Sequence, residues 1–333
     1  MSIRVGILGA GSWALGLGNL CHLKGHHVTL WEFRPDACRE LDETRLAPKL
    51  LPGFSIPSEL RFSNSLAETV ADAELILIVV PSHTMRIVAE QLGQCSFHAP
   101  IVSATKGLER ITHLRMTEVI TSAIPRIQSD CVAALSGPSH AEEVVKGFPT
   151  SVVIACPSLD NAHKVQHWLS GPTFRLYSST DIVGVELGGA LKNIVALAAG
   201  VSDGLGFGDN TKGLLMTRGL AEITRLGLVM GGDARTFAGL SGLGDLITTC
   251  ISQHSRNRFV GQELGKGRKI EDILSGMTMV AEGVNATTAA LELSKACGVE
   301  LPIAQTMYDV MYSGKDIKIA ARDLMTRALK KED

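Results

Sequence analysis

A lysine lies near the middle of a long apolar segment, residues 181–204, where Leu or Ala would be usual. If this segment is a helix, Gly184, Gly188 and Gly189 lie on or beside the same face as Lys192, so another backbone or a flat ligand could come close to it. Burial penalises an ammonium group, so a buried Lys192 would have a lowered pKa and could give or take a proton. Alternatively, its stem crosses apolar surface while the amine reaches water.

Two further polar groups follow Lys192 in the chain. Asp245 comes directly after the glycine-rich run 239–244, and Ser255, Arg256 and Asn257 follow a short predicted helix. A guanidinium next to a helix N-terminus suits a phosphate, because the side chain and the backbone N–H groups all donate hydrogen bonds. The alternative for Arg256 is a surface salt bridge.

The start of the chain has the pattern of a dinucleotide-binding turn. An apolar run at 3–8 leads into GAGSWA at 9–14, and a helical pattern of small residues follows. Gly9 would allow the tight turn, Gly11 would let the backbone approach a pyrophosphate, and Ala14 replaces the usual third glycine. The phosphate would then lie at the helix N-terminus. A single match of this kind is weak without its context.

The predicted second strand, residues 27–31, supplies part of that context. Glu32 follows it at the distance where a carboxylate accepts hydrogen bonds from an adenosine ribose. Arg34 could instead bind a 2'-phosphate with two hydrogen bonds. The pair leaves both NAD and NADP open and slightly favours NAD, because Glu32 would repel an added phosphate. A solvated loop is the alternative.

Apolar runs predict further strands at 75–80, 101–104, 131–135, 151–155 and 174–177. The strands at 101–104 and 131–135 end in polar, glycine-bearing loops that contain Lys106, Gly137 and Ser139. Ligands of a doubly wound sheet bind at the carboxyl ends of its strands, so these residues should converge on the cofactor.

After residue 181 the strand pattern ends and apolar residues recur at helical spacing. Helices are predicted at 181–202, 211–227, 233–238, 244–251, 257–265, 270–274, 283–297, 302–311 and 316–322. The sequence therefore predicts an α/β Rossmann domain with a doubly wound, mostly parallel sheet at 1–179, and an all-α substrate and catalytic domain at 180–333.

Composition limits the partners. The formal net charge of −2 gives no basic footprint for nucleic acid or for a membrane surface, which favours a small-molecule partner. The seven cysteines are scattered, as in a reducing cytoplasm, and Lys192 interrupts the one long apolar segment. His163 and His167 have a spacing that could bind zinc, but no third ligand accompanies them, so no metal site is expected. Ser136 and Ser139 lack the G-x-S-x-G pattern of a nucleophile elbow, so no serine nucleophile is expected.

Seven short motifs together resemble the NAD(P)-dependent glycerol-3-phosphate dehydrogenases of the soluble bacterial type. In chain order they are GAGSWA at 9–14, ATKGLE at 104–109, SGPSHAEE at 136–143, ALKN at 190–193, GLGDL at 242–246, SRN at 255–257 and AEG at 281–283. The resemblance implies a helical domain of the 6-phosphogluconate dehydrogenase-like kind, a homodimer, and interconversion of dihydroxyacetone phosphate and sn-glycerol 3-phosphate that supplies glycerophospholipid synthesis.

The resemblance also implies roles for individual residues. The cofactor site would contain Ser12, Trp13, Arg34, Lys106, Ala141, Arg256, Val280 and Glu282, in addition to Gly9, Gly11 and Glu32. The substrate would contact Lys106, Gly137, Ser139, Lys192, Asp245, Ser255, Arg256 and Asn257. Lys192 would be the proton donor or acceptor, Lys106 would add positive charge, and Asp245 would orient Lys192 or a substrate hydroxyl.

Three residues depart from the family pattern. Ala14 stands where the family commonly has glycine, and Glu32 stands where a small residue is frequent. His140 stands where phenylalanine is usual. Two alternatives also stay open. A dehydrogenase of the hydroxyacid or 6-phosphogluconate type shares the fold plan and a catalytic lysine, and a nicotinamide-binding sensor could have lost the chemistry.

Overall fold

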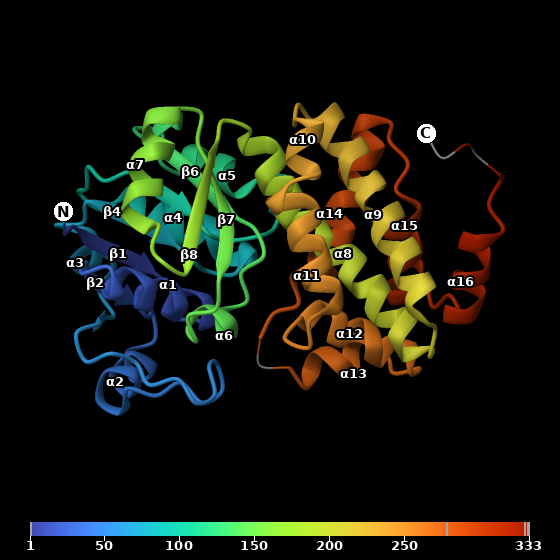
Figure 1. Cartoon of the computed structure of the whole chain (residues 1–333), viewed down its shortest axis with the longest axis horizontal. Helices are drawn as coiled ribbons and strands as arrows, with labels where there is room; N and C mark the ends of the chain where they lie inside the picture. The colour runs from blue at the N-terminus through green and yellow to red at the C-terminus, as the bar shows by residue number, and fades with distance from the viewer. Residues whose placement is uncertain (1, 278, 330, 332–333) are drawn as a thin grey trace.

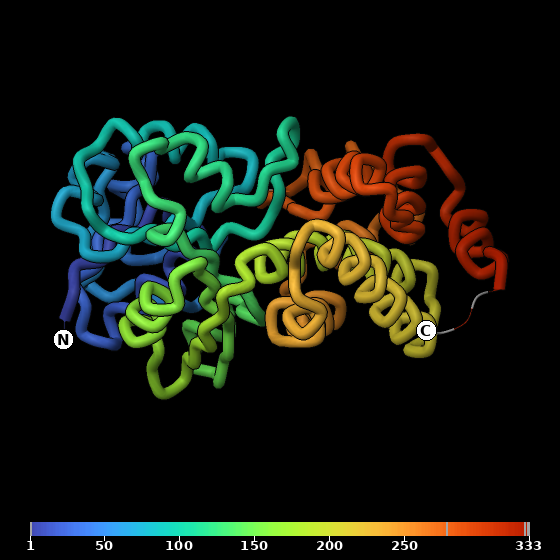
Figure 2. Tube along the Cα trace, turned by 90° about the horizontal axis from the view of Figure 1, so that it is seen from above, coloured from blue at the N-terminus to red at the C-terminus, as the bar shows by residue number. Residues whose placement is uncertain are grey.

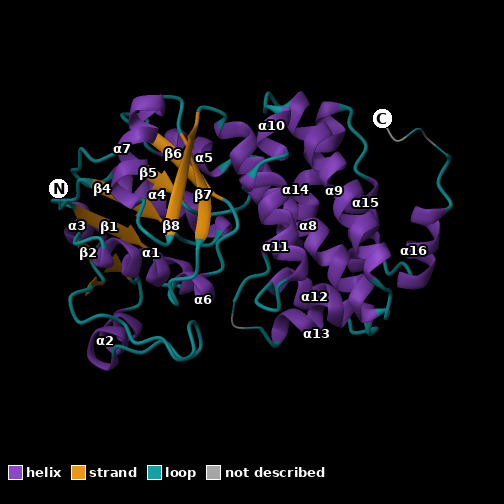
Figure 3. Cartoon of the chain, in the orientation of Figure 1, coloured by secondary structure: helices purple, strands orange, loops and turns teal. Residues whose placement is uncertain are grey.

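Eight strands form one sheet in the N-terminal half of the chain (Figures 1 and 3). The structure is a computed structural model that describes residues 2–277, 279–329 and 331. The strands are β1 (Arg4–Leu8), β2 (His27–Trp31), β3 (Arg61–Ser63), β4 (Leu75–Ile78), β5 (Ile101–Ser103), β6 (Val132–Ser136), β7 (Thr150–Ala155) and β8 (Phe174–Ser179). Their order is β3-β2-β1-β4-β5-β6-β7-β8, and every neighbouring pair is parallel except β6 and β7. The predicted mostly parallel, doubly wound sheet is confirmed.

Helices cover both faces of this sheet. They are α1 (Ser12–Leu23), α2 (Pro35–Thr44), α3 (Leu66–Val70), α4 (Met85–Gly93), α5 (Met116–Ala123), α6 (Ala141–Val144) and α7 (Leu159–Leu169). One apolar core lies between the sheet and α1, α6 and α7, and a second lies under α3, α4 and α5. Burial from both sides explains why the central strand β4 reads as an unbroken apolar run, LILI.

The edge strand β3 is absent from the predicted strands. It is only three residues long, and among them only Ser63 is buried. A strand of this kind has no apolar alternation to detect, so its place beside β2 is decided by tertiary pairing.

The second half of the chain is helical, with α8 (Ile182–Gly204) at its centre (Figure 1). The other helices are α9 (Asp209–Val229), α10 (Ala234–Phe237), α11 (Asp245–Ile251), α12 (Arg256–Gly265), α13 (Ile270–Ser275), α14 (Glu282–Cys297), α15 (Pro302–Tyr312) and α16 (Ile317–Met325), with one π-helical turn at Leu240–Gly244. α8 is long and apolar enough to cross a bilayer, but 89% of its apolar window is buried inside the protein. It is the core helix of this half.

Glycines let α12 approach α8 closely. A Cβ atom on Gly200 of α8 would lie 2.0 Å from the carbonyl oxygen of Arg258, and one on Gly261 of α12 would lie 2.0 Å from that of Leu197. Larger residues at these positions would push the two helices apart. The contact fixes α12 against α8, and with it the position of Arg256.

An arm of the N-terminal half, residues 105–115, reaches onto the helical half (Figure 2). Leu108 of this arm is buried in the helical core, and His113 Nε2 lies 2.7 Å from Glu292 Oε2 of α14. At its far end, Arg115 contacts the buried Glu186 of α8 at 2.6 Å. The part of the arm that follows Lys106 therefore joins the two halves.

A buried carboxylate in the helical half should make the protein less stable as the pH rises. Glu222 of α9 accepts hydrogen bonds from the backbone N–H of Ile303 at 2.9 and 3.1 Å, and burial raises its pKa from 4.5 to about 7. The folded state therefore holds a proton that the unfolded state has released, so this group's contribution is full below pH 4.5 and is lost as the pH rises through about 7. At 1.36 kcal/mol per pKa unit the loss reaches about 3 kcal/mol.

Glu222→Gln removes this titration and keeps an oxygen for Ile303. Urea unfolding at pH 5 and pH 8 should show a gain in stability for the variant over the wild type that is larger at pH 8. A gain of the same size at both pH values would contradict the assignment.

Candidate active site

The glycine-rich turn after β1 has the form of a pyrophosphate site. Gly9 has a φ of +124°, and a Cβ atom there would lie 2.4 Å from the carbonyl oxygen of Val79. Gly11 occupies the N-cap of α1 without a side-chain cap, and a Cβ atom built on it meets nothing within 4 Å. Gly11 and residues 12–14 of the first turn of α1 line a cavity, so a dinucleotide phosphate can reach the free N–H groups of this turn.

Glu32 and Arg34 are paired at the end of β2. Glu32 is 8% exposed, and its Oε1 accepts hydrogen bonds from the backbone N–H of Arg34 at 3.2 Å and from its Nε at 2.9 Å. Both contacts use the same oxygen, so Oε2 makes no hydrogen bond to the described residues. That oxygen remains available to a ribose hydroxyl.

A cavity of about 380 Å³ lies between the carboxyl edge of the sheet and the helical half. Most of the predicted site residues line it: Gly11, Ser12, Trp13, Lys106, Ser139, Ala141, Lys192, Asp245, Ser255, Arg256, Asn257, Val280 and Glu282. Gly9, Glu32, Arg34 and Gly137 lie outside its wall. Of the residues that line the cavity but are absent from the predicted sites, Thr249, His140 and His254 bear most directly on its chemistry.

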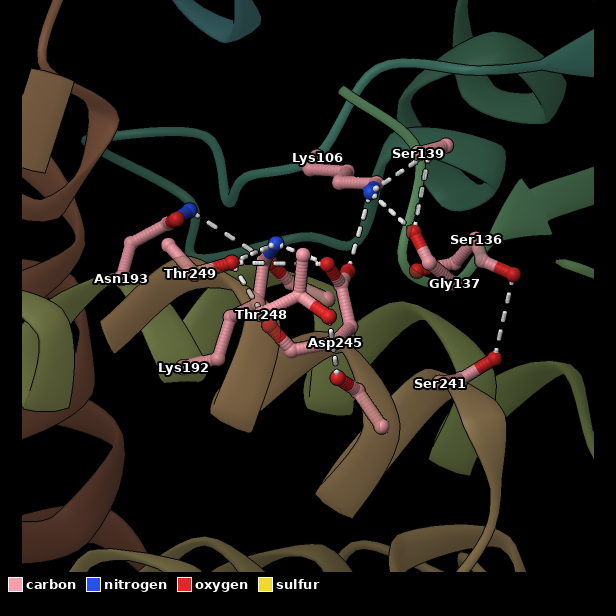
Figure 4. A network of polar contacts seen from close by, with 12 residues as sticks. Lys106, Ser136, Gly137, Ser139, Lys192, Asn193, Ser241, Asp245, Thr248 and Thr249 are labelled. Atoms are coloured by element: carbon pink, nitrogen blue, oxygen red, sulfur yellow. Dashed lines mark hydrogen bonds and ion pairs between the residues drawn. The ribbon is translucent and has the colours of Figure 1, made fainter. Parts of the chain in front are cut away.

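Asp245 lies between two lysines in this cavity (Figure 4). Lys192 Nζ donates hydrogen bonds to Asp245 Oδ1 and, at 2.7 Å, to Thr249 Oγ1. Lys106 Nζ donates to the other carboxylate oxygen, Oδ2, at 2.9 Å. Lys192 and Asp245 are 5% and 2% exposed, so the ion pair is almost completely desolvated.

Burial and charge set the protonation of this group. Burial lowers the pKa of Lys192 from 10.5 to about 8; the carboxylate of Asp245 opposes the shift and the ammonium of Lys106 adds to it. Burial alone would raise the pKa of Asp245, but the two ammonium groups outweigh it and hold this pKa below its usual value. The lysine can therefore exchange a proton near neutral pH while the carboxylate stays ionised.

The backbone before α11 positions Asp245. The π-helical turn at Leu240–Gly244 leads directly into Asp245, the first residue of α11. Within this turn, Ser241 Oγ donates to the carbonyl oxygen of Ser136 at the end of β6, at 3.3 Å. A π-helical turn is a rare local structure that is frequent at functional sites.

Lys106 is held from the sheet side. Its Nζ donates to the carbonyl oxygen of Gly137 at 2.8 Å and contacts Ser139 Oγ at 3.3 Å. The predicted convergence of Lys106, Gly137 and Ser139 is present, but Gly137 acts through its carbonyl oxygen on Lys106 and does not line the cavity. The sheet therefore fixes an ammonium opposite the helical half.

Arg256 is the free member of the SRN cluster. Ser255 Oγ accepts the N–H of Arg258 and caps α12, and the amide of Asn257 donates to Asn193 Oδ1 at 2.9 Å while its oxygen accepts the N–H of Gly283. The guanidinium of Arg256 makes no hydrogen bond or ion pair with the described residues, although it lines the cavity at the N-terminus of α12. This arrangement suits a phosphate group.

Glu282 links the two sides of the cavity. Its Oε1 accepts the backbone N–H of Ser82, which follows β4, at 3.0 Å, and its Oε2 accepts the Ser82 hydroxyl. Nearby, Ser12 Oγ donates to the carbonyl oxygen of Leu50 at 2.8 Å and lies 3.9 Å from Met279 Sδ. Ser12 and Glu282, both predicted for the cofactor site, therefore line the same cavity from the two halves.

The glycines around Lys192 serve protein packing. A Cβ atom on Gly188 would lie 2.6 Å from the carbonyl oxygen of Ser241, and one on Gly189 would lie 2.4 Å from Ser136 Oγ. The expectation that another backbone approaches this face is met. The expectation that these glycines make room for a ligand is wrong, because the π-helical turn and the end of β6 fill that space.

Comparison with known proteins identifies the family. The family models described as the N-terminus and the C-terminus of NAD-dependent glycerol-3-phosphate dehydrogenase match residues 4–162 and 181–322. A glycerol-3-phosphate dehydrogenase [NAD(P)+] of Chlorobium luteolum is 47% identical over 99% of both chains, and one of Citrifermentans bemidjiense is 46% identical over 100% of this chain and 99% of its own.

A solved structure agrees with these sequence relatives. The crystal structure of glycerol-3-phosphate dehydrogenase from Coxiella burnetii superposes with a TM-score of 0.93 at 34% identity, covering 98% of this chain and 99% of that one. The matches extend over the sheet, the cavity and the helical half alike. The chain belongs to the NAD-dependent glycerol-3-phosphate dehydrogenase family.

Proposed function

We propose that this protein interconverts dihydroxyacetone phosphate and sn-glycerol 3-phosphate with NAD(P)H or NAD(P)+. The observation that carries the proposal is a single cavity that holds a buried lysine of lowered pKa, an arginine at a helix N-terminus that pairs with none of the described residues, and an open glycine-rich turn. These features match a carbonyl to be reduced, a phosphate and a dinucleotide. Family membership adds the substrate pair.

Lys192 is the proposed proton donor and acceptor. When the C2 carbonyl is reduced, negative charge develops on its oxygen, and an ammonium close to that oxygen stabilises the charge and delivers a proton. In the reverse direction the neutral amine takes the proton back. Asp245 and Thr249 hold Lys192 Nζ in place, and Lys106 adds positive charge from the sheet side.

Arg256 is the proposed phosphate ligand. Its guanidinium presents two parallel donors, and the N-terminus of α12 adds backbone N–H groups. Ser255 and Asn257 support this position by capping α12 and by fixing it to Asn193 of α8. Their proposed contribution to substrate binding is therefore largely through the backbone.

The dinucleotide fits the turn at Gly11, with Ser12, Trp13, Ala141, Val280 and Glu282 along its path. When bound, its nicotinamide supplies or accepts the hydride. The chain's own residues hold the ligand, exclude water and manage the proton.

The pair Glu32 and Arg34 should make NADH the better coenzyme. A 2'-phosphate would lie close to the carboxylate of Glu32, whereas a ribose hydroxyl can donate to its Oε2, which accepts no hydrogen bond from the described residues. Replacing Glu32 with serine should lower kcat/KM for NADH about tenfold, the effect of one hydrogen bond to a charged group, and should raise it for NADPH.

Arg34→Ala is the matched control, because it removes the other member of the pair and should weaken NADPH more than NADH. Steady-state kinetics with both coenzymes measure these effects. An unchanged ratio of the two kcat/KM values in Glu32→Ser would show that Glu32 does not set the preference.

The proposed reaction is tested by measuring oxidation or reduction of the nicotinamide coenzyme with candidate substrates in parallel. Dihydroxyacetone phosphate should support turnover, and NADP+ with 6-phosphogluconate or NAD+ with simple hydroxyacids should not. Binding of NADH without turnover of any of them would instead indicate a nicotinamide sensor and would overturn the proposal.

The same family membership supports three wider proposals. The protein acts in the cytoplasm as a homodimer, and its product supplies glycerophospholipid synthesis.

An exposed apolar stripe over the π-helical turn and α11 is a surface that a second copy could cover. It consists of Leu243, Ile247 and Ile251, which follow one another at four-residue steps. Sedimentation equilibrium should give twice the chain mass.

A further inference from the structure

An unassigned imidazole lines the cavity from the sheet side. His140 follows Ser139 in the loop after β6 and directly precedes α6. Its ring centroid lies 5.9 Å from that of His254, which comes from the loop before α12. The two rings, one from each half of the protein, are tilted by 54° and line the same cavity as Lys192 and Arg256.

The His140 ring has an unused polar atom. Its Nε2 is buried and has no hydrogen-bond partner among the described residues. A buried polar atom without a partner costs free energy, so its place beside a ligand cavity requires an explanation. A phenylalanine would fill the same space without that cost.

The surroundings keep this ring neutral. The pKa of His140 is lowered from 6.5 to about 4, mainly by burial and then by the ammonium groups of Lys192 and Lys106, while Asp245 opposes the shift and His254 adds a small lowering. A neutral imidazole carries one donor and one acceptor nitrogen. It can therefore pair with a hydroxyl or a phosphate oxygen without adding a further positive charge to the cavity.

We propose that His140 is a substrate-binding residue whose Nε2 hydrogen-bonds to an oxygen of the bound three-carbon phosphate ester. The inference rests on the proposed function and adds a contact to that site. Rotation of the ring about Cβ–Cγ is a soft torsion, so Nε2 can turn from its buried position toward a ligand oxygen in the cavity. The energetic cost of the unpaired nitrogen in the free protein is then relieved when substrate binds.

Three variants separate this contact from packing. His140→Phe keeps an aromatic ring and removes both nitrogens. In His140→Gln the side-chain amide nitrogen lies near the position of Nε2 of the histidine. In His140→Asn the side-chain amide nitrogen lies near the position of Nδ1. The KM for dihydroxyacetone phosphate should rise about fivefold in His140→Phe, as expected for one hydrogen bond. The kcat and the KM for NADH should change less than about twofold, because the contact belongs to substrate binding. His140→Gln should restore the wild-type KM, and His140→Asn should resemble His140→Phe.

Thermal unfolding supplies a readout independent of turnover. Without ligand, His140→Phe should have a Tm equal to or above that of the wild type, and saturating glycerol 3-phosphate should raise its Tm less. An unchanged KM with an unchanged ligand shift would overturn the inference. So would equal KM increases in all three variants together with a lower Tm, since that pattern indicates packing alone. If wild-type protein does not oxidise NADH with dihydroxyacetone phosphate, the proposed function fails first, and this is distinguishable from both outcomes.

Discussion

Replacing Lys192 with alanine should lower kcat for reduction of dihydroxyacetone phosphate by about 10²- to 10⁴-fold, the usual contribution of a positioned acid or base. The KM should change much less, because the ammonium matters most when charge develops on the carbonyl oxygen. Lys192→Met is the matched variant, since it keeps the apolar stem and removes only the charge. Circular dichroism and Tm should show that both variants fold.

Two further readouts distinguish proton transfer from a structural role of Lys192. Added small primary amines should restore part of the kcat of Lys192→Ala, because the vacated space admits a substitute ammonium. In the wild type, oxidation of glycerol 3-phosphate should accelerate as the pH rises through about 8, where Lys192 becomes the neutral acceptor, and reduction should slow over the same range. Wild-type turnover in Lys192→Ala, or an unchanged pH profile, would remove Lys192 from the chemistry.

Replacing Arg256 with alanine should raise the KM for dihydroxyacetone phosphate roughly 10- to 150-fold, the range given by one hydrogen-bonded charge contact of about 1.5–3 kcal/mol. The guanidinium has no hydrogen-bond or ion-pair partner among the described residues, so the folded state should keep its stability. The measurement is steady-state kinetics with substrate varied at saturating NADH. A loss confined to kcat would contradict phosphate binding.

Arg256→Lys is the matched control for the geometry of this contact. It keeps the positive charge but cannot present two parallel donors, so its KM should fall between those of the wild type and Arg256→Ala. Inorganic phosphate should protect wild-type protein against thermal unfolding more than it protects Arg256→Ala. Equal protection of both would place the phosphate elsewhere.

Local sequence patterns predict the strands and helices, because each strand or helix depends mainly on residues that are close together in the sequence. The turn at Gly9 and Gly11 follows from an apolar strand and small residues, and α8 follows from its apolar length. Lys192 was recognisable as a charge in an apolar segment. Its partner Asp245 lies 53 residues away, and Lys106 lies 139 residues from Asp245, so no local spacing could predict that the three meet.

Tertiary contacts also decide how individual side chains are used. Ser255 and Asn257 read as ligand residues in the SRN cluster, yet one caps α12 and the other hydrogen-bonds to Asn193. Gly188 and Gly189 suggest space for a ligand, yet protein atoms fill it. The sequence shows which residue types are present, but only the packing of α8 against the sheet and the π-helical turn shows which of them remain free.

The central claim is hydride transfer to C2 of dihydroxyacetone phosphate in the cavity that holds Lys192. Incubation with dihydroxyacetone phosphate and NADH that carries deuterium at both C4 positions, followed by mass spectrometry and NMR of the product, tests it directly. We expect sn-glycerol 3-phosphate with one deuterium at C2, formed by the wild type and at least 100-fold more slowly by Lys192→Ala. Product without deuterium at C2, or equal rates for the two proteins, would contradict the account.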